Sequence, residues 1–118
     1  MEPFNSGERP DFAKLGGLVP AVIQDQLTLK VLMLGFMNRE AYDRTMSGED
    51  VWFYSRSRQE LWHKGETSGN CLKVRSVWVN CEDNSLLIKA HPMGPTCHTG
   101  NRSCYYRRLS GKGANPAQ

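Results

Sequence analysis

The stretch LVPAVIQDQLTLKVLMLGF, residues 18–36, decides the fold because two apolar segments flank a short polar one. The segments Leu18–Gln24 and Thr28–Phe36 have the length and the apolar, partly β-branched composition of strands. Asp25 and Gln26 lie between them, and polar residues in such a place favour a turn. The stretch therefore predicts a β-hairpin.

The residues after this hairpin predict a short helix. Asn38 is a residue type that caps helix N-termini, residues 39–47 read REAYDRTMS, and Gly48 is suited to ending a helix. Further apolar segments predict strands at Val51–Ser55, Leu72–Asn80 and Leu86–Ala90, with a turn at Glu82–Ser85. The chain should therefore continue with a helix and then return to strands.

The last part of the chain has a weaker pattern. Proline and glycine in His91–Gly100 predict a loop. Ser103–Leu109 is compatible with either a strand or a short helix, and its pattern does not choose between them. The elements together predict a small, mixed α+β domain that contains more sheet than helix.

The length of 118 residues corresponds to one domain, which we assign to residues 12–109, with flexible termini at 1–11 and 110–118. With 39% apolar and 23% charged residues, the chain has the composition of a folded protein rather than a disordered one. No apolar run reaches the roughly 18 residues of a membrane span. Residues 1–11 lack the basic-then-apolar order of a signal peptide, so we expect a soluble, cytoplasmic protein.

The formal net charge of +3 and the isoelectric point near 8.8 indicate a mildly basic protein. This value lies below the threshold of about 9 that is typical of nucleic-acid-binding domains. The net charge is compatible with binding an anionic small molecule at least as well as with binding a nucleic acid. The cationic residues form two groups, comprising Arg56, Arg58, His63, Lys64, Lys73 and Arg75, and then Arg102, Arg107, Arg108 and Lys112.

Three of the four cysteines, Cys81, Cys97 and Cys104, lie at the edges of predicted elements, where their thiolates could bind one zinc ion. In a reducing cytoplasm disulfides rarely form, so metal binding becomes the more favoured role for these cysteines. Three protein ligands leave an open position, at which zinc lowers the pKa of a water toward about 7. A fourth ligand, from Cys71, His91 or His98, would instead give a structural zinc. Free buried thiols are the competing interpretation.

Cys71 is the least suited of the four cysteines to this role, because it lies where a predicted strand begins. We assign it to packing.

Three segments resemble phosphoribosyl-AMP cyclohydrolases, the ring-opening enzymes of histidine biosynthesis. They are SRSRQELWHKGETSGN (55–70), NCEDNSLLIKAHPMGPTCHTGNRSCYY (80–106) and GFMNREA (35–41). The resemblance implies that Cys81, Cys97 and Cys104 bind zinc, and that an intertwined homodimer supplies the ligands of each zinc from both subunits. The substrate it implies is 1-(5-phosphoribosyl)-AMP, whose N1–C6 bond is hydrolysed to give the formamidine carboxamide ribonucleotide.

The chain departs from the family around its first zinc cysteine. The family has three aspartates there that bind magnesium, and the matching positions are Asn80, Glu82 and Asn84. Two amides in place of two carboxylates remove two formal charges, and magnesium prefers carboxylates. The pattern therefore predicts weaker magnesium binding or none.

Two residues are candidates for moving protons in the reaction. His98 follows a zinc cysteine and has a side chain that titrates near neutrality. Glu66, in the GETSG motif, is the second candidate. The competing interpretations are that His98 positions its loop and that Glu66 forms a surface ion pair. We expect His63 and His91 to be ordinary surface histidines.

The two phosphates of such a substrate require cationic and hydroxyl donors, and arginine suits bidentate phosphate contact. The candidates are Arg56, Arg58, Lys64, Thr67, Ser68 and Arg102. On composition alone, a charged run is more often a solvated surface. Trp52 and Trp62 could stack on a base, although tryptophan is more often found in a core or an interface.

Two other functions remain open at this stage. The altered aspartate positions are compatible with a relative that acts on another purine nucleotide. A zinc-stabilised nucleic-acid-binding module is a third possibility, but the aromatic motifs of RNA-binding domains are absent. We expect no membrane partner and no nucleic-acid partner.

Overall fold

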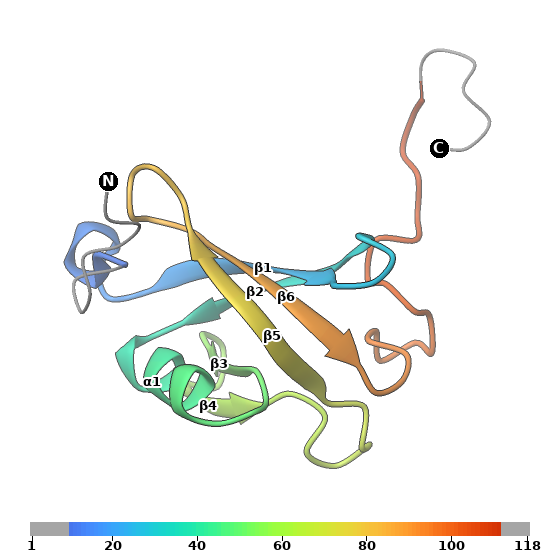
Figure 1. The fold of residues 1–118 in the computed structure, drawn as a ribbon, viewed down its shortest axis with the longest axis horizontal. Helices are drawn as coiled ribbons and strands as arrows, with labels where there is room; N and C mark the ends of the chain where they lie inside the picture. The colour runs from blue at the N-terminus through green and yellow to red at the C-terminus, as the bar shows by residue number, and fades with distance from the viewer. Residues whose placement is uncertain (1–9, 112–118) are drawn as a thin grey trace.

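The computed structural model describes residues 10–111 (Figure 1). Their elements, in chain order, are η1 (Phe12–Leu15), β1 (Val19–Asp25), β2 (Val31–Met37), α1 (Arg39–Ser47), β3 (Trp52–Ser55), β4 (Glu60–His63), β5 (Leu72–Val79) and β6 (Leu86–Pro92). The predicted sheet-rich α+β class is confirmed. Most of the predicted flexible termini, residues 1–9 and 112–118, lie outside the described residues.

The predicted hairpin is confirmed, with β1 and β2 paired in antiparallel register from Val19 opposite Met37. Its second strand begins at Val31 rather than Thr28, so the predicted start was wrong. The carboxylate of Asp25 accepts hydrogen bonds from the backbone N–H groups of Leu27 (2.8 Å) and Thr28 (3.2 Å). These bonds hold the chain in a turn, which is longer than the polar residues alone predicted.

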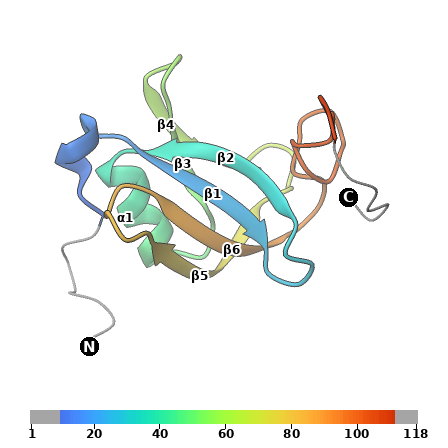
Figure 2. The ribbon, with the colours of Figure 1, turned by 90° about the horizontal axis from the view of Figure 1, so that it is seen from above.

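Residues 10–111 form a four-stranded sheet with the order β2-β1-β6-β5 and a separate two-stranded sheet, β3-β4. β6 pairs in parallel with β1 and antiparallel with β5 (Figures 1 and 2). β3 packs against both β2 and α1. The Phe53 ring in β3 is fully buried, and a Cβ atom at Gly35 would lie 2.5 Å from it. Glycine at this position therefore lets the small sheet pack against β2.

The predicted helix is confirmed with its boundaries. The Asn38 side chain accepts a hydrogen bond from the Ala41 N–H (2.8 Å), and the Gly48 N–H donates to the Arg44 carbonyl. The buried Thr45 hydroxyl donates to the Ala41 carbonyl and accepts from the Trp52 N–H at 2.9 Å. The helix is thereby joined to β3. No helix within residues 10–111 has the length and apolar character to cross a lipid bilayer.

Two segments differ from the sequence-based expectation. The strand β4 was not predicted, because its sequence ELWH places two adjacent apolar residues between polar ones and shows no alternation. Ser103–Leu109, for which strand and helix were both considered, adopts neither structure. The Ser103 hydroxyl donates to the Val31 carbonyl (2.7 Å) and the Cys104 N–H to the Leu32 carbonyl (2.8 Å). These two tertiary contacts hold the segment beside β2 without a regular ladder.

Candidate active site

A cleft of about 570 Å³ lies between two loops that carry the sequence motifs. One loop, residues 64–70, follows β4, and the other, residues 95–104, follows β6. The cleft brings together seven of the fourteen candidate residues, which are Arg58, Lys64, Glu66, Thr67, Ser68, Cys97 and His98. Five of them lie within residues 58–68 and the other two at 97–98, so the fold assembles the cleft from two distant segments.

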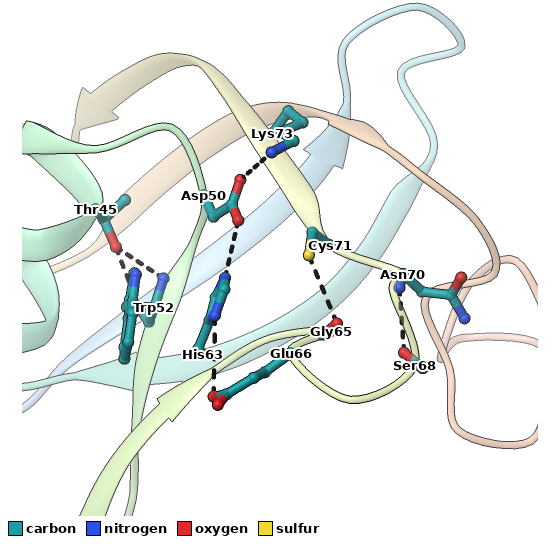
Figure 3. Close-up of polar contacts among 10 residues, drawn as sticks. All are labelled: Thr45, Asp50, Trp52, His63, Gly65, Glu66, Ser68, Asn70, Cys71 and Lys73. Carbon is teal, nitrogen blue, oxygen red and sulfur yellow. Dashed lines mark hydrogen bonds and ion pairs between the residues drawn. The ribbon is translucent and has the colours of Figure 1, made fainter.

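Glycine determines the shape of the 64–70 loop. Gly65 and Gly69 have positive φ values of 84° and 83°, and the Gly69 N–H donates to the Gly65 carbonyl at 2.8 Å. A Cβ atom at Gly65 would lie 2.5 Å from the backbone of Asn70 and Cys71. The Ser68 hydroxyl accepts from the Asn70 N–H (3.1 Å; Figure 3). The compact turn leaves the Thr67 and Ser68 side chains exposed at the cleft.

Lys64 connects the two loops. Its ammonium donates a hydrogen bond to the Thr96 carbonyl at 2.6 Å. An ammonium carries three N–H donors, so this bond leaves others that can contact an anion in the cleft. Lys64 thus fixes the distance between the loops and supplies positive charge at the same place.

The 95–104 loop holds Cys97 in a specific environment. The Thr99 hydroxyl donates to the Cys97 sulfur at 3.0 Å, and the Cys97 N–H donates to the Asn101 carbonyl. Hydrogen bonds from the Thr99 side chain and backbone lower the pKa of the Cys97 thiol. The loop thereby favours a thiolate at this position, as a metal ligand requires.

Cys104 lies close enough to Cys97 for each thiol to shift the pKa of the other. Desolvation raises the pKa of Cys104, and the adjacent Cys97 raises it further. Backbone contacts to β2, described above, hold Cys104 in place. The structure thus brings two of the three predicted zinc ligands together within one chain.

Cys81 lies apart from this thiol pair. It is exposed in the turn between β5 and β6, whereas the thiol pair follows the other end of β6. The seven residues of β6 span about 20 Å. A single chain therefore does not assemble all three cysteines at one point.

The turn that contains Cys81 is closed by amide groups. The Asn80 side chain donates to the Asn84 side-chain oxygen at 2.6 Å, and its own oxygen accepts from the N–H groups of Asn84 (2.9 Å) and Ser85 (3.1 Å). Magnesium prefers oxygen ligands with negative charge. Because these amide oxygens are engaged and neutral, and because only Glu82 of the three positions is a carboxylate, the turn does not fit a magnesium ion.

The other cationic candidates are spread more widely. Arg58 lines the cleft, 3.8 Å from Glu60. Arg56 stacks on the Phe36 ring at 4.1 Å and lines a second cavity of about 540 Å³ together with Asn84. Arg102 is exposed on the 95–104 loop and does not line the cleft. Arg56 is thus near the Cys81 turn rather than the thiol pair.

Both candidate proton-transfer residues line the cleft and are exposed to solvent. His98 follows Cys97 directly in the 95–104 loop. Glu66 lies on the facing loop, with its carboxylate 3.9 Å from Nδ1 of His63. The geometry is therefore compatible with proton transfer by either residue.

The expectation that His63 is an ordinary surface histidine was wrong. Its side chain is only 21% exposed, its ring stacks on Trp52 with centroids 4.6 Å apart, and Nε2 lies 2.8 Å from Asp50 Oδ2 (Figure 3). Asp50 Oδ1 in turn pairs with the Lys73 ammonium at 2.7 Å. Sequence reasoning missed this network because the contacts join residues that are distant in the chain.

The two tryptophans differ in their availability to a ligand. Trp52 is covered by His63 on the ring face and lies beneath the Arg44 guanidinium at 4.8 Å. Trp62 lines the cleft and is 40% exposed. The Lys64 ammonium lies 5.6 Å from the Trp62 ring centroid, so of the two rings Trp62 is the one beside the cleft, with a cation already next to it. A cleft lined by the Cys97 thiol, cationic donors and two titratable side chains is typical of an enzyme that acts on an anionic small molecule.

Comparison with known proteins identifies the family. Residues 33–106 match the family model of phosphoribosyl-AMP cyclohydrolase. The chain is 46% identical over 109 residues to the phosphoribosyl-AMP cyclohydrolase of Clostridium beijerinckii, which covers 92% of this chain and 100% of that protein. It is 51% identical over 98 residues to the corresponding enzyme of Lactiplantibacillus plantarum, covering 83% and 91%. The chain therefore belongs to the phosphoribosyl-AMP cyclohydrolase family.

A third relative is a longer protein. The histidine biosynthesis bifunctional protein HisIE of Bacteroides thetaiotaomicron is 57% identical over 95 residues, which are 80% of this chain and 47% of that protein. The expectation of a hydrolase of histidine biosynthesis is thus confirmed for the family.

Proposed function

We propose that the chain hydrolyses the N1–C6 bond of the adenine ring in 1-(5-phosphoribosyl)-AMP, which gives the formamidine carboxamide ribonucleotide of histidine biosynthesis. The observation that carries the proposal is the hydrogen bond from Lys64 to the Thr96 carbonyl. It brings the loop with the GETSG motif against the loop with the thiol pair. The names of the relatives support the same substrate.

The thiol pair fits zinc by its chemistry, because thiolate sulfur is a preferred zinc ligand and two thiols already lie together. Cys97 and Cys104 would hold the ion with a third thiolate. Since Cys81 of the same chain lies at the far end of β6, we propose that Cys81 of a second copy completes the set. Zinc held there would polarise a water and lower its pKa toward neutrality.

A homodimer is consistent with the exposed apolar side chains on the sheet. Trp78 is 56% exposed on β5 and Leu34 is 41% exposed on β2. Leu34 also lines a cavity of about 540 Å³ together with Phe36 and Trp62. Apolar surface of this kind favours association with another copy.

The same association would place Arg56 near the substrate. Arg56 and Asn84 line one cavity, at the end of the molecule that carries Cys81. A second copy that brings Cys81 to the thiol pair therefore also brings Arg56. The two phosphates would then be bound by Arg58, Lys64, Thr67 and Ser68 of one chain and by Arg56 of the other. Arg102 remains a further donor at the rim.

The reaction adds one water molecule across the N1–C6 bond. The water oxygen bonds to C6 and becomes the carboxamide oxygen, while the N1–C6 bond breaks and its electron pair goes to N1. One water proton must be transferred to N1, and a side chain that reaches both positions would carry it, while the other proton goes to the exocyclic imino nitrogen on C6, which becomes the carboxamide NH2. We propose His98 or Glu66 for this role, since they face the cleft from opposite loops.

Magnesium has no part in this proposal. The residues at its family positions form the closed amide turn described above, and no step is derived through that ion.

The amide turn also favours a second candidate function, hydrolysis of a different N1-substituted purine nucleotide. A parallel assay of several purine nucleotides separates the two, because faster turnover of another nucleotide would replace phosphoribosyl-AMP as the substrate.

We also propose a reducing compartment, the cytoplasm, for this enzyme. Cys71, Cys81, Cys97 and Cys104 are all free thiols in the structure. Free cysteines that serve as metal ligands persist where disulfides do not form.

The test of the proposed function is the ring-opening assay with phosphoribosyl-AMP. We expect Cys97→Ser and treatment with a strong zinc chelator each to reduce kcat at least 100-fold, because both remove the group that activates water. The matched control is Ser47→Ala on α1, which lies outside the residues that line the three cavities and should retain activity. Equal turnover of zinc-loaded and chelated enzyme would disprove the mechanism.

A further inference from the structure

We propose that Asp50, His63 and Cys71 form a second metal site, suited to zinc or a similar divalent cation. Each residue offers one ligand atom, and these three atoms lie within 4.8 Å of one another. None of the three residues belongs to the cysteine set proposed for the catalytic zinc. The site depends on its own geometry and not on the proposed function.

The backbone holds the three residues in a fixed arrangement. Asp50 forms a bridge with Lys73 just before β3, His63 is the last residue of β4, and Cys71 immediately precedes β5. The Val51 N–H donates to the Leu72 carbonyl (3.0 Å), and the Met93 N–H donates to the Cys71 carbonyl (2.9 Å). The ends of β3, β4 and β5 therefore hold the three side chains close together before any metal binds.

The donor set indicates the kind of cation. Sulfur, imidazole nitrogen and carboxylate oxygen are all zinc ligands, with bond lengths of about 2.0–2.3 Å. Magnesium and calcium prefer oxygen alone. All three residues are partly buried, which limits competition from water. The combination selects zinc, cobalt or cadmium over the alkaline-earth ions.

The surroundings of His63 orient it for such a role. The ring is held flat against Trp52 at 4.6 Å, and Nε2 points to Asp50. Nδ1 lies 3.9 Å from the Glu66 carboxylate. At 3.9 Å the Glu66 carboxylate does not accept a hydrogen bond in the metal-free chain, but it stands beside the nitrogen whose N–H a carboxylate usually accepts in a metal-ligating histidine.

In the metal-free chain, the Lys73 ammonium neutralises the Asp50 carboxylate that would bind the metal. Its ammonium lies 2.7 Å from Asp50 Oδ1, while the Cys71 thiol faces the Gly65 carbonyl at 3.6 Å. Binding would form bonds from sulfur, nitrogen and oxygen to the cation, release the thiol proton to solvent, and replace the Nε2 proton that His63 shares with Asp50 by the metal, the imidazole then carrying its proton on Nδ1. The 31% exposed Lys73 side chain would move away from Asp50. Lys73 is therefore a competitor of the metal.

The position of the site suggests what a bound metal would do. His63 and Cys71 flank the 64–70 loop, whose Glu66 and Ser68 are drawn in Figure 3. Lys64 is the first residue of the same loop. A cation that joined them would close this loop at its base and reduce its freedom. The metal would have a structural role beside the cleft.

The first experiment measures zinc per chain by native mass spectrometry on the full chain. We expect the wild type to bind one zinc more than Cys71→Ala does. Cys97→Ser should retain this additional zinc, so that failure of the catalytic zinc and failure of this site give different results. Equal zinc content in the wild type and Cys71→Ala would overturn the proposal.

A second measurement is needed because Cys71→Ala could disturb the loop. In a Cys81→Ser, Cys97→Ser, Cys104→Ser background, Cys71 is the one remaining thiol of the sequence. Cobalt added to this variant should give a sulfur-to-cobalt charge-transfer band, and the further change Cys71→Ser should abolish it. Absence of the band in the folded triple variant would contradict the site.

A third comparison separates a metal site from a purely structural ion-pair network. Lys73→Gln removes the competing ammonium, so zinc should bind about tenfold more tightly. The matched control is Lys30→Gln, which removes a surface charge at the β1–β2 turn and should leave the affinity unchanged. Unchanged or weaker zinc binding in Lys73→Gln would show that Asp50 is not a ligand and would overturn the triad.

Discussion

Gly65 is the single residue on which the cleft loop most depends. Its φ of 84° and the 2.5 Å approach of a hypothetical Cβ to the Asn70 backbone both exclude a side chain. We expect Gly65→Ala to lower the free energy of unfolding by more than about 2 kcal/mol and to reduce ring-opening activity. The control is Gly69→Ala, which has φ of 83° but no atom within 4 Å of its Cβ.

Gly69→Ala should therefore cost only the conformational penalty of about 1 kcal/mol. Urea denaturation of both variants provides the measurement. Equal losses of unfolding free energy in the two variants would show that the close approach at Gly65 does not contribute to stability.

Asp50 provides a residue-scale prediction for pH. The hydrogen bond from Lys73, followed by that from His63, holds the pKa of Asp50 below its ordinary value of 3.8. A lowered pKa stabilises the folded state at pH values above 3.8, and this contribution is lost as the pH falls through the lowered pKa. Asp50→Asn should therefore be less stable than wild type at neutral pH, and the difference should shrink in acid.

Unfolding free energies between neutral and acid pH, measured with a chelator present, test this expectation. Asp43→Asn is the control, because Asp43 forms only an exposed pair with Arg39 on α1. A difference between Asp50→Asn and wild type that stays constant with pH would contradict the assignment.

At the scale of an element, the β5–β6 turn is held by amides instead of a cation. The Asn80–Asn84 side-chain hydrogen bond would become a pair of like charges in Asn80→Asp, Asn84→Asp. We expect this double variant to be destabilised and to regain stability with millimolar magnesium, since a divalent cation neutralises the carboxylates. The wild-type melting temperature should not respond to magnesium.

Thermal unfolding with and without magnesium is the measurement. The double variant Asn80→Ser, Asn84→Ser serves as the control, because it breaks the amide bond without adding charge and should not respond to magnesium. A rise in the wild-type melting temperature with magnesium would show that the turn binds the ion despite its amides.

At the scale of the whole molecule, the separation of Cys81 from Cys97 and Cys104 predicts complementation between inactive chains. Cys81→Ser and Cys97→Ser should each be inactive alone, while subunits refolded from an equal mixture should recover about a quarter of the wild-type activity. Half of the dimers are then mixed, and each has one intact site of two. The recovered ring-opening rate is the measurement.

A mixture of Cys97→Ser with Cys104→Ser is the matched control, because both changes fall in the same half of the site. It should remain inactive. Recovery in this control, or none in the first mixture, would contradict a site shared between two copies.

Local patterns in the sequence were enough to predict the elements that are stabilised by contacts between residues close in the chain. Asn38 and Gly48 bounded the helix correctly because a cap satisfies backbone groups within one turn. The β1–β2 hairpin followed from two apolar segments around a turn. The motif segments predicted the family, and half of the candidate residues in them line one cleft.

Only the tertiary structure decided which distant residues meet. The parallel pairing of β1 with β6, the contact of Lys64 with Thr96, and the position of His63 beside Asp50 depend on contacts far apart in the chain. No local propensity records such contacts, because they are stabilised by burial and pairing across the whole fold. For the same reason, Cys81 and Cys97 look alike in the sequence, yet lie beyond opposite ends of one strand.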